Sequence, residues 1–127
     1  MRMFITLAGA LALIGCGSST TTVSTKSAEV APQEVFRIKN TLAEQTGDPG
    51  AAKFQNVYVA DLSNGDRVYC GQMSFVDQQG GLTGFTPFYL RQRGEVVKAI
   101  NWLEHSAEFS SQKCAEARSG ALRINDV

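Results

Sequence analysis

NVYVADL-SNGD-RVYCGQMSF, residues 56–75, decides the fold. Apolar and polar side chains alternate in the two outer runs, which is the pattern of a half-buried strand. Asn64-Gly65 lies between the runs, and this dipeptide is the strongest short signal for a type I′ hairpin, whose two central residues both need positive φ. We therefore predict an antiparallel hairpin with strands over residues 56–62 and 67–75.

Two more strands are predicted after this hairpin. Phe85 to Arg91 alternates again, and Gly94-Glu95 turns the chain into VVKAI, residues 96–100. The glycine-rich segment 78–84 between the second and third strands indicates a turn with positive φ. A phosphate-binding loop would instead lead into a helix and carry a lysine, which this segment lacks. The pattern predicts a four-stranded antiparallel meander.

A helix is predicted on each side of the meander. Within residues 29–45, apolar side chains recur with helical spacing, Pro32 suits the first turn, and Gly47 follows as a stop. From Asn101 onward, a stripe of small and apolar residues recurs at steps of three and four up to Gly120. The predicted fold class is α+β: an N-terminal helix, a four-stranded antiparallel meander and a C-terminal helix packed on the sheet.

The first sixteen residues resemble the leader of a bacterial lipoprotein. One arginine precedes an apolar run over residues 4–15, which is shorter than the about 20 residues that a membrane-spanning helix needs. Leu13-Ile14-Gly15-Cys16 then matches the lipobox of that class. The resemblance implies that residues 1–15 are a signal peptide, and that Cys16 is acylated and anchors the mature chain in membrane lipid.

A tether and one small domain are expected after the lipidated cysteine. Residues 16–27 are mostly Ser and Thr, so we expect a flexible segment with a typical reach of about 20 Å. The remaining residues, 28–127, are expected to form one α+β domain. Gly17, rather than Asp, follows Cys16. By resemblance to the sorting of enteric lipoproteins, this favours the outer membrane and a location in the cell envelope, facing the periplasm.

Charge and composition exclude several function classes. Twelve basic residues balance twelve acidic ones, whereas nucleic-acid binding proteins usually carry a basic excess. Three cysteines and one histidine are too few for a Cys/His zinc site. We therefore expect no nucleic-acid partner, no metal site and no cofactor.

Cys70 and Cys114 are candidates for a structural disulfide. With Cys16 acylated, these two cysteines remain in an oxidising compartment. One lies on a predicted strand and the other on the sheet-facing stripe of the last helix, so a bridge would join the two elements. A redox-active pair is the alternative, but that chemistry favours Cys-x-x-Cys spacing and a thiol with a lowered pKa.

The sequence contains no recognisable catalytic constellation. His105 is the only histidine and lies beside Glu104, so it could act as a lone base; an exposed helix histidine is the ordinary interpretation. The aromatic run at Phe85, Phe88 and Tyr89 cannot face one side of a strand throughout. We interpret it as a partner surface, with burial in the core as the alternative.

The centre of the chain resembles a family of small secreted or lipid-anchored bacterial and phage-associated proteins. The resemblance is carried by residues 48–54 (DPGAAKF), 68–71 (VYCG) and 80–88 (GGLTGFTPF). The family pattern is Asp-Pro-x-Ser-Ala-x-Phe, a Cys-Gly strand and Gly-Gly-Tyr-x-Gly-Phe-x-Pro-Phe. Gly50 and Leu82 stand where the family has Ser and Tyr. The family is largely uncharacterised, so the resemblance implies fold and compartment but no catalytic residue.

Three functions follow as hypotheses. The first is a lipid-anchored, non-enzymatic module that binds another envelope component, such as a phage-exclusion factor or a periplasmic inhibitor. The second is a small envelope hydrolase that uses His105 with a carboxylate. The third is a purely structural envelope lipoprotein.

Overall fold

The structure, a computed structural model, describes residues 20–125. The elements follow one another as β1 (Thr21–Ser27), α1 (Pro32–Ala43), the 3-10 turn η1 (Pro49–Ala51), β2 (Lys53–Leu62), β3 (Arg67–Ser74), β4 (Thr86–Arg93), β5 (Val96–Asn101), the 3-10 turn η2 (Glu104–Ser106), α2 (Ala107–Ser119) and β6 (Ala121–Ile124). None of the helices in this part of the chain has the length and apolar character needed to cross a membrane.

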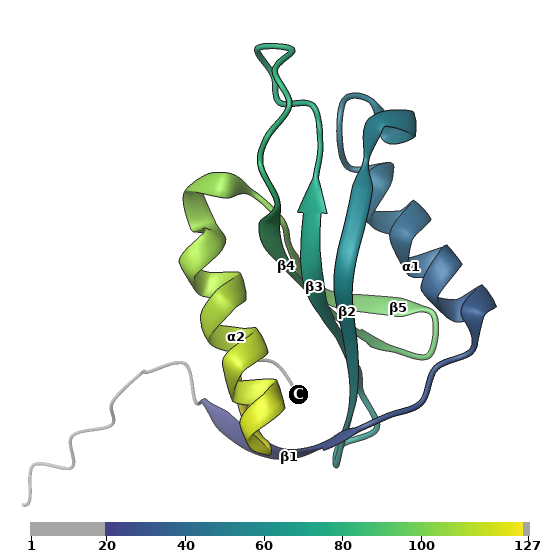
Figure 1. Cartoon of the computed structure of the whole chain (residues 1–127). Helices are drawn as coiled ribbons and strands as arrows, with labels where there is room; N and C mark the ends of the chain where they lie inside the picture. Colours follow the sequence, from purple (N-terminus) through teal and green to yellow (C-terminus); the bar gives the residue numbers. More distant parts are fainter. Residues whose placement is uncertain (1–19, 126–127) are drawn as a thin grey trace, which may run out of the picture.

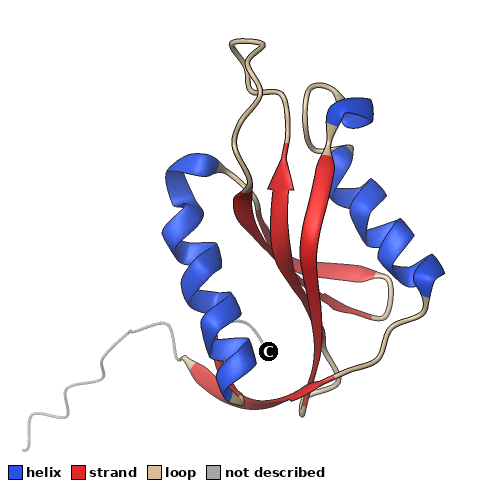
Figure 2. Ribbon diagram, viewed as in Figure 1, coloured by secondary structure: helices blue, strands red, loops and turns tan. Residues whose placement is uncertain are grey.

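One antiparallel sheet carries the fold, with a helix on each side (Figures 1 and 2). Its strand order is β5-β4-β3-β2-β1-β6. The α+β class, the antiparallel sheet and the helix near the C-terminus confirm the prediction. The predicted four-stranded meander is present as β2 to β5, but the prediction missed β1 and β6. Because β1 precedes α1, this helix is not the first element of the domain.

The central strands β3 and β4 are buried on both faces because their side chains alternate between two cores. Val68 and Cys70 of β3 point into the α2-side core, which includes Cys114 and Ala117 of α2. Their neighbours in β3 point the other way, into the α1-side core, whose buried members are Ile38, Leu42, Val59, Tyr69, Met73, Phe75, Phe88 and Leu90. A strand between two helix-covered faces therefore exposes neither side.

The predicted tether is wrong for Thr21–Ser27, because these residues form β1. Residues 21–24 pair with β6, and residues 25–27 pair with β2. Val23 is buried in the α2-side core. The pairing satisfies backbone groups on both neighbouring strands and offsets the low hydrophobicity of a Ser/Thr segment. The earlier part of the predicted tether, residues 16–19, lies outside the described residues, as do Cys16 itself and the proposed signal peptide.

The β2–β3 hairpin is present where it was predicted, but its turn differs from type I′. Gly65 has a φ of 93°, whereas Asn64 keeps a negative φ. The Leu62 carbonyl accepts a hydrogen bond from the Gly65 N–H, and the Leu62 N–H donates to the Asp66 carbonyl. This is a three-residue loop in which a turn is followed by a left-handed glycine, a common alternative that also fits the strand twist.

The helices agree with the predicted ones in position but are shorter at their starts. The helix predicted from residue 29 begins at Pro32, and the one predicted from Asn101 is preceded by η2 and begins at Ala107. Gly120 ends α2 with a φ of 103°, a conformation that suits glycine at this position.

Cys70 of β3 and Cys114 of α2 form the predicted disulfide, with Cα atoms 5.7 Å apart. The bond joins α2 to a central strand of the sheet. Next to it, Gly71 packs directly against the Phe88 ring: a Cβ at this position would lie 2.9 Å from two ring carbons. The absence of a side chain at Gly71 therefore lets the Phe88 ring approach the backbone of β3 closely.

Candidate functional site

The predicted partner surface is only partly exposed. Phe88 and Tyr89 retain 1% and 2% of their accessible surface, so the prediction is wrong for these two residues. They point to opposite faces of β4, and each face is covered by a helix, so alternation does not bring either ring to solvent. Phe85 precedes β4 and is 46% exposed, which agrees with a place at the surface.

Three loops meet at one end of the sheet, which we call the loop end (residues 44–52, 75–85 and 102–106). Strand register places them together: Lys53, the first residue of β2, pairs with Ser74, the last residue of β3. Asn101 at the end of β5 pairs with Tyr89 in the first half of β4. Figure 1 shows the three loops close together above the sheet, with β1 at the opposite end.

A pocket of about 430 Å³ opens at the loop end, with a wall from each of the three loops. This volume falls within the range of small-molecule sites, about 300–1,000 Å³. Phe75 and Trp102 form its aromatic floor, with ring centroids 5.0 Å apart in an edge-to-face arrangement. Phe75 is buried and Trp102 is half-buried, so the indole is held from one side and reachable from the other.

The β3–β4 loop holds its own shape through local hydrogen bonds. The Asp77 carboxylate accepts hydrogen bonds from the backbone N–H groups of Gln79 and Gly81, each at 3.0 Å. The Thr83 hydroxyl accepts from the Phe75 N–H, and the Thr83 N–H donates to the Phe75 carbonyl. Gly80 has a φ of 81°, as the glycine-rich sequence predicted for this turn. The loop is therefore a small closed hairpin that presents its outer residues in a fixed arrangement.

The rim of the pocket is polar, and no lysine or arginine is among its described residues. Gln45, Gln78 and Gln79 are exposed and line it. Glu104 and His105, both exposed, line the side formed by η2. Among the residues that the structure describes, none of those lining the pocket is a lysine or an arginine. The pocket therefore offers amide and carboxylate groups around an aromatic floor.

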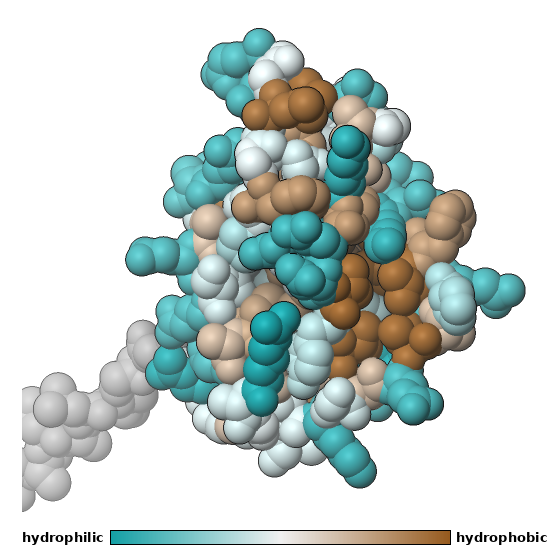
Figure 3. Space-filling view, in the orientation of Figure 1, coloured by the Kyte–Doolittle hydropathy of each residue, from teal (hydrophilic) through white to brown (hydrophobic). Residues whose placement is uncertain are grey.

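Exposed apolar side chains accompany the pocket. Leu82 at the β3–β4 loop is 70% exposed, and Leu103 is 40% exposed. Figure 3 shows apolar surface at the tip of this loop, and a larger apolar area over β2 and α1 where half-buried residues border the α1-side core. Side chains exposed to this degree contribute little to folding, and Leu103 adds apolar surface to the pocket lining.

His105 lies at the pocket, as a catalytic reading would require, but its surroundings do not orient it. In the described part of the chain, no carboxylate hydrogen-bonds to its imidazole, and the residue is exposed on η2. A general base normally has such an orienting partner. Nor does the range 20–125 contain a group of three or more His, Cys, Asp or Glu side chains placed to hold a metal ion.

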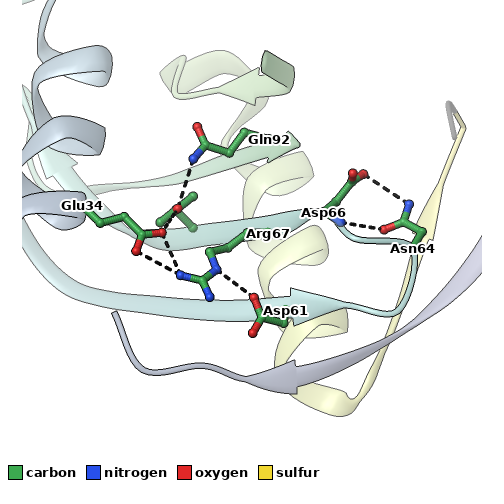
Figure 4. A network of polar contacts seen from close by, with 7 residues as sticks. Glu34, Asp61, Asn64, Asp66, Arg67 and Gln92 are labelled. Carbon is green, nitrogen blue, oxygen red and sulfur yellow. Dashed lines mark hydrogen bonds and ion pairs between the residues drawn. The ribbon is translucent and has the colours of Figure 1, made fainter. Parts of the chain in front are cut away.

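A second polar cluster ties the start of α1 to the sheet (Figure 4). Arg67 donates hydrogen bonds to both carboxylate oxygens of Glu34, at 2.8 and 3.0 Å, and to Asp61 at 2.7 Å. The Tyr69 hydroxyl also donates to Glu34 and accepts from Gln92. Burial raises the pKa of Glu34, but the hydrogen bonds from Tyr69 and Arg67 outweigh it and hold this pKa below its ordinary value. Burial and the Glu34 contact raise the pKa of Tyr69 to about 12.

Asp66 forms a separate, buried group of ion pairs with two arginines of β4. Its side chain is fully buried and pairs with Arg91 at 2.5 Å and with Arg93 at 2.6 Å. Burial raises the pKa of Asp66, but the hydrogen bonds and charges of the two arginines outweigh it, so the pKa lies below its ordinary value. Because the carboxylates here are engaged by guanidinium groups, we interpret the cluster as a stabilising network and the loop-end pocket as the candidate functional site.

Comparison of the chain with models of protein families, with curated proteins and with solved structures finds no match. The case for the loop end is therefore made by its geometry. Of its residues, the sequence had singled out His105, Phe85 and the glycine-rich loop, but not the glutamines. The signal that could have found them is the antiparallel meander itself. Every second connection of a meander lies at the same end of the sheet, so the polar segments before β2, between β3 and β4 and after β5 meet there.

Proposed function

We propose that this protein is a lipid-anchored module of the cell envelope that binds another envelope component with its loop end and performs no chemistry on it. The lipobox resemblance of Leu13-Ile14-Gly15-Cys16 supports the anchor, and the Cys70–Cys114 bridge supports an oxidising compartment. Gly17 after the lipidated cysteine supports the outer membrane, with the domain facing the periplasm.

The observation that carries the proposal is the position of the pocket relative to β1. Thr25 of β1 pairs with Leu62 at the far end of β2, whereas the pocket lies beyond the start of β2. Three residues lie between Cys16 and Thr20, and the four steps between them span at most about 14 Å. The 10 residues of β2 extend over about 33 Å. An anchor at Cys16 therefore keeps β1 near the bilayer and directs the pocket away from it.

Recognition is favoured over catalysis by the character of the loop end. It combines a preformed pocket with exposed Leu82 and Leu103, whereas His105 has no orienting carboxylate among the described residues. One observation favours the alternative function, a small hydrolase: His105 and Glu104 line the same pocket. If His105 performs chemistry, His105→Ala should remove the cellular effect of the protein while its contacts persist. The binding function predicts that the effect and the contacts change together, so that the effect is not lost while the contacts persist.

Site-specific photo-crosslinking in intact cells tests the proposal. A photoreactive amino acid replaces Gln78 at the loop end or, as the matched control, the exposed Lys26 of β1. We expect one discrete crosslinked species from position 78 and none of that size from position 26. Leu82→Asp should weaken the product at position 78, because it places a charge in the contact surface. Equal crosslinking from both positions, or none from position 78, would contradict a binding role for the loop end and would leave a purely structural role.

A further inference from the structure

The loop-end pocket has the chemistry of a carbohydrate site, and we propose that it binds an uncharged oligosaccharide built from pyranose rings. This inference rests on the proposed function, since it names the class of ligand for the same end of the fold. It depends on three properties of the pocket: an aromatic floor, a rim of amides, and a described lining without lysine or arginine.

The aromatic floor suits the apolar face of a sugar ring. Trp102 is half-buried and is braced edge-to-face by the buried Phe75, with ring centroids 5.0 Å apart. The axial C–H groups of a pyranose form a flat apolar face that packs on an indole. A braced ring keeps its orientation when the site is empty, so little conformational freedom is lost on binding.

The amide rim suits hydroxyl groups. Each of Gln45, Gln78 and Gln79 carries two N–H donors and a carbonyl acceptor. A sugar hydroxyl likewise both donates and accepts, so neighbouring hydroxyls can bond to an amide in both directions. The carboxylates of Asp77 and Glu104 provide further acceptors at the pocket.

The charge of the pocket argues against an anionic ligand. The described lining contains no lysine or arginine, and its charged members, Asp77 and Glu104, are acidic. A phosphate or carboxylate ligand would meet like charges without a lysine or arginine partner. A neutral ligand avoids this cost, and the amides satisfy its hydroxyls, which would otherwise lose their hydrogen bonds to water.

The chain contains one tryptophan, Trp102, and its place in the pocket makes fluorescence a direct report of occupancy. The lipidated protein is titrated in a sugar-free amine-oxide detergent with tri-N-acetylchitotriose and, separately, with cellotriose. We expect a saturable change in tryptophan emission with at least one of them, at a Kd of about 1 mM or tighter. Inorganic phosphate at the same concentrations is expected to leave the emission unchanged.

Paired variants show whether the response comes from the rim. The double variant Gln78→Ala, Gln79→Ala should weaken binding roughly tenfold, the loss of one or two hydrogen bonds. Gln112→Ala, an equivalent change on the exposed surface of α2, should leave the Kd unchanged. Urea unfolding confirms that each variant is folded.

A flat titration with both sugars, or a response that the double variant does not weaken, overturns the sugar assignment. Photo-crosslinking from position 78 separates this failure from failure of the proposed function. Crosslinks that persist with a flat titration keep the loop end as a binding surface and reject only the carbohydrate. Loss of both rejects the binding function as well.

Discussion

Replacing Cys70 and Cys114 together by alanine opens a loop with a sequence separation of 44 residues. In the loop-entropy description, a bridge that closes this length of chain contributes about 4 kcal/mol at 25 °C, because it restricts the unfolded state. A 127-residue chain has a total stability of about 5–15 kcal/mol. The bridge therefore decides whether the domain is firmly or marginally folded.

The two cysteines also fill the α2-side core. Cys70 is fully buried and Cys114 is 9% exposed, so the alanine variant loses both sulfur atoms from the packed interior as well as the bond. Reduction of the unchanged protein by dithiothreitol opens the loop and keeps the sulfurs. The difference between the two samples separates the entropy of the loop from the packing of the sulfurs.

Urea unfolding followed by circular dichroism measures both effects. All samples carry Cys16→Ser, so that the protein is free of lipid. We expect the free energy of unfolding to fall by about 3–5 kcal/mol in the double alanine variant and by somewhat less in the reduced protein. A loss below about 1 kcal/mol in both samples would refute the reasoning, because it would mean that α2 stays on β3 without the bond.

Three further predictions test the interior with the same assay. Phe88→Ala should lower the free energy of unfolding by about 3–5 kcal/mol because the ring is buried, whereas Phe85→Ala should lower it by less than about 1 kcal/mol. Equal losses would contradict the burial of Phe88 and support the predicted aromatic surface. Asp66→Asn should lower the free energy of unfolding by about 3–5 kcal/mol, because it removes a carboxylate from the buried Arg91 guanidinium. A change within experimental error would show that the ion pair contributes nothing to stability. The pKa values of Glu34 and Asp66 are held below their ordinary values, so the stability they contribute is present at neutral pH and is lost as the pH falls through the ordinary carboxyl range toward the lowered values. Glu34→Gln should reduce the loss in the free energy of unfolding between pH 6 and pH 2. An unchanged dependence of this free energy on pH would exclude Glu34 as a contributor.

The central strands were predictable because their pattern is local. Residues 56–62 and 67–75 alternate, and Asn64-Gly65 marks the turn between them, so the hairpin needed no information from elsewhere in the chain. The turn type differed because a left-handed Gly65 after an ordinary turn satisfies the same strand twist. The Cys70–Cys114 disulfide was predictable because, once Cys16 was interpreted as lipidated, these two cysteines remained, one on a predicted strand and one on the sheet-facing stripe of the last helix.

The outer strands were not predictable from hydrophobicity. Thr21–Ser27 contains one buried apolar residue, Val23, and its strand conformation depends on pairing with β6 and β2. The signal that the prediction passed over is the high β-propensity of threonine. Ala121–Ile124 is short, and its two buried residues give too little alternation to distinguish a strand from a loop.

The prediction that Phe88 and Tyr89 lie at the surface was also wrong because it lacked information about distant parts of the chain. A strand with one solvent-exposed face must expose some aromatic residues if they occur on both sides, and this argument placed Phe88 and Tyr89 at the surface. Helices on both faces of the sheet remove the exposed face, and the sequence does not show on which side each helix packs. The loop-end pocket depends on the same three-dimensional information, because its walls come from residues 45–47, 75–79 and 102–105.

Mass spectrometry of the mature protein purified from its native membranes tests the central claim most directly, since the proposed location and the outward direction of the loop end depend on the anchor. The account predicts a chain that begins at Cys16 and carries a diacylglycerol on its sulfur. It also predicts that palmitate labelling is lost in Cys16→Ser. A mature chain that begins elsewhere, or one that begins at Cys16 without lipid, would contradict the anchor and the orientation derived from it.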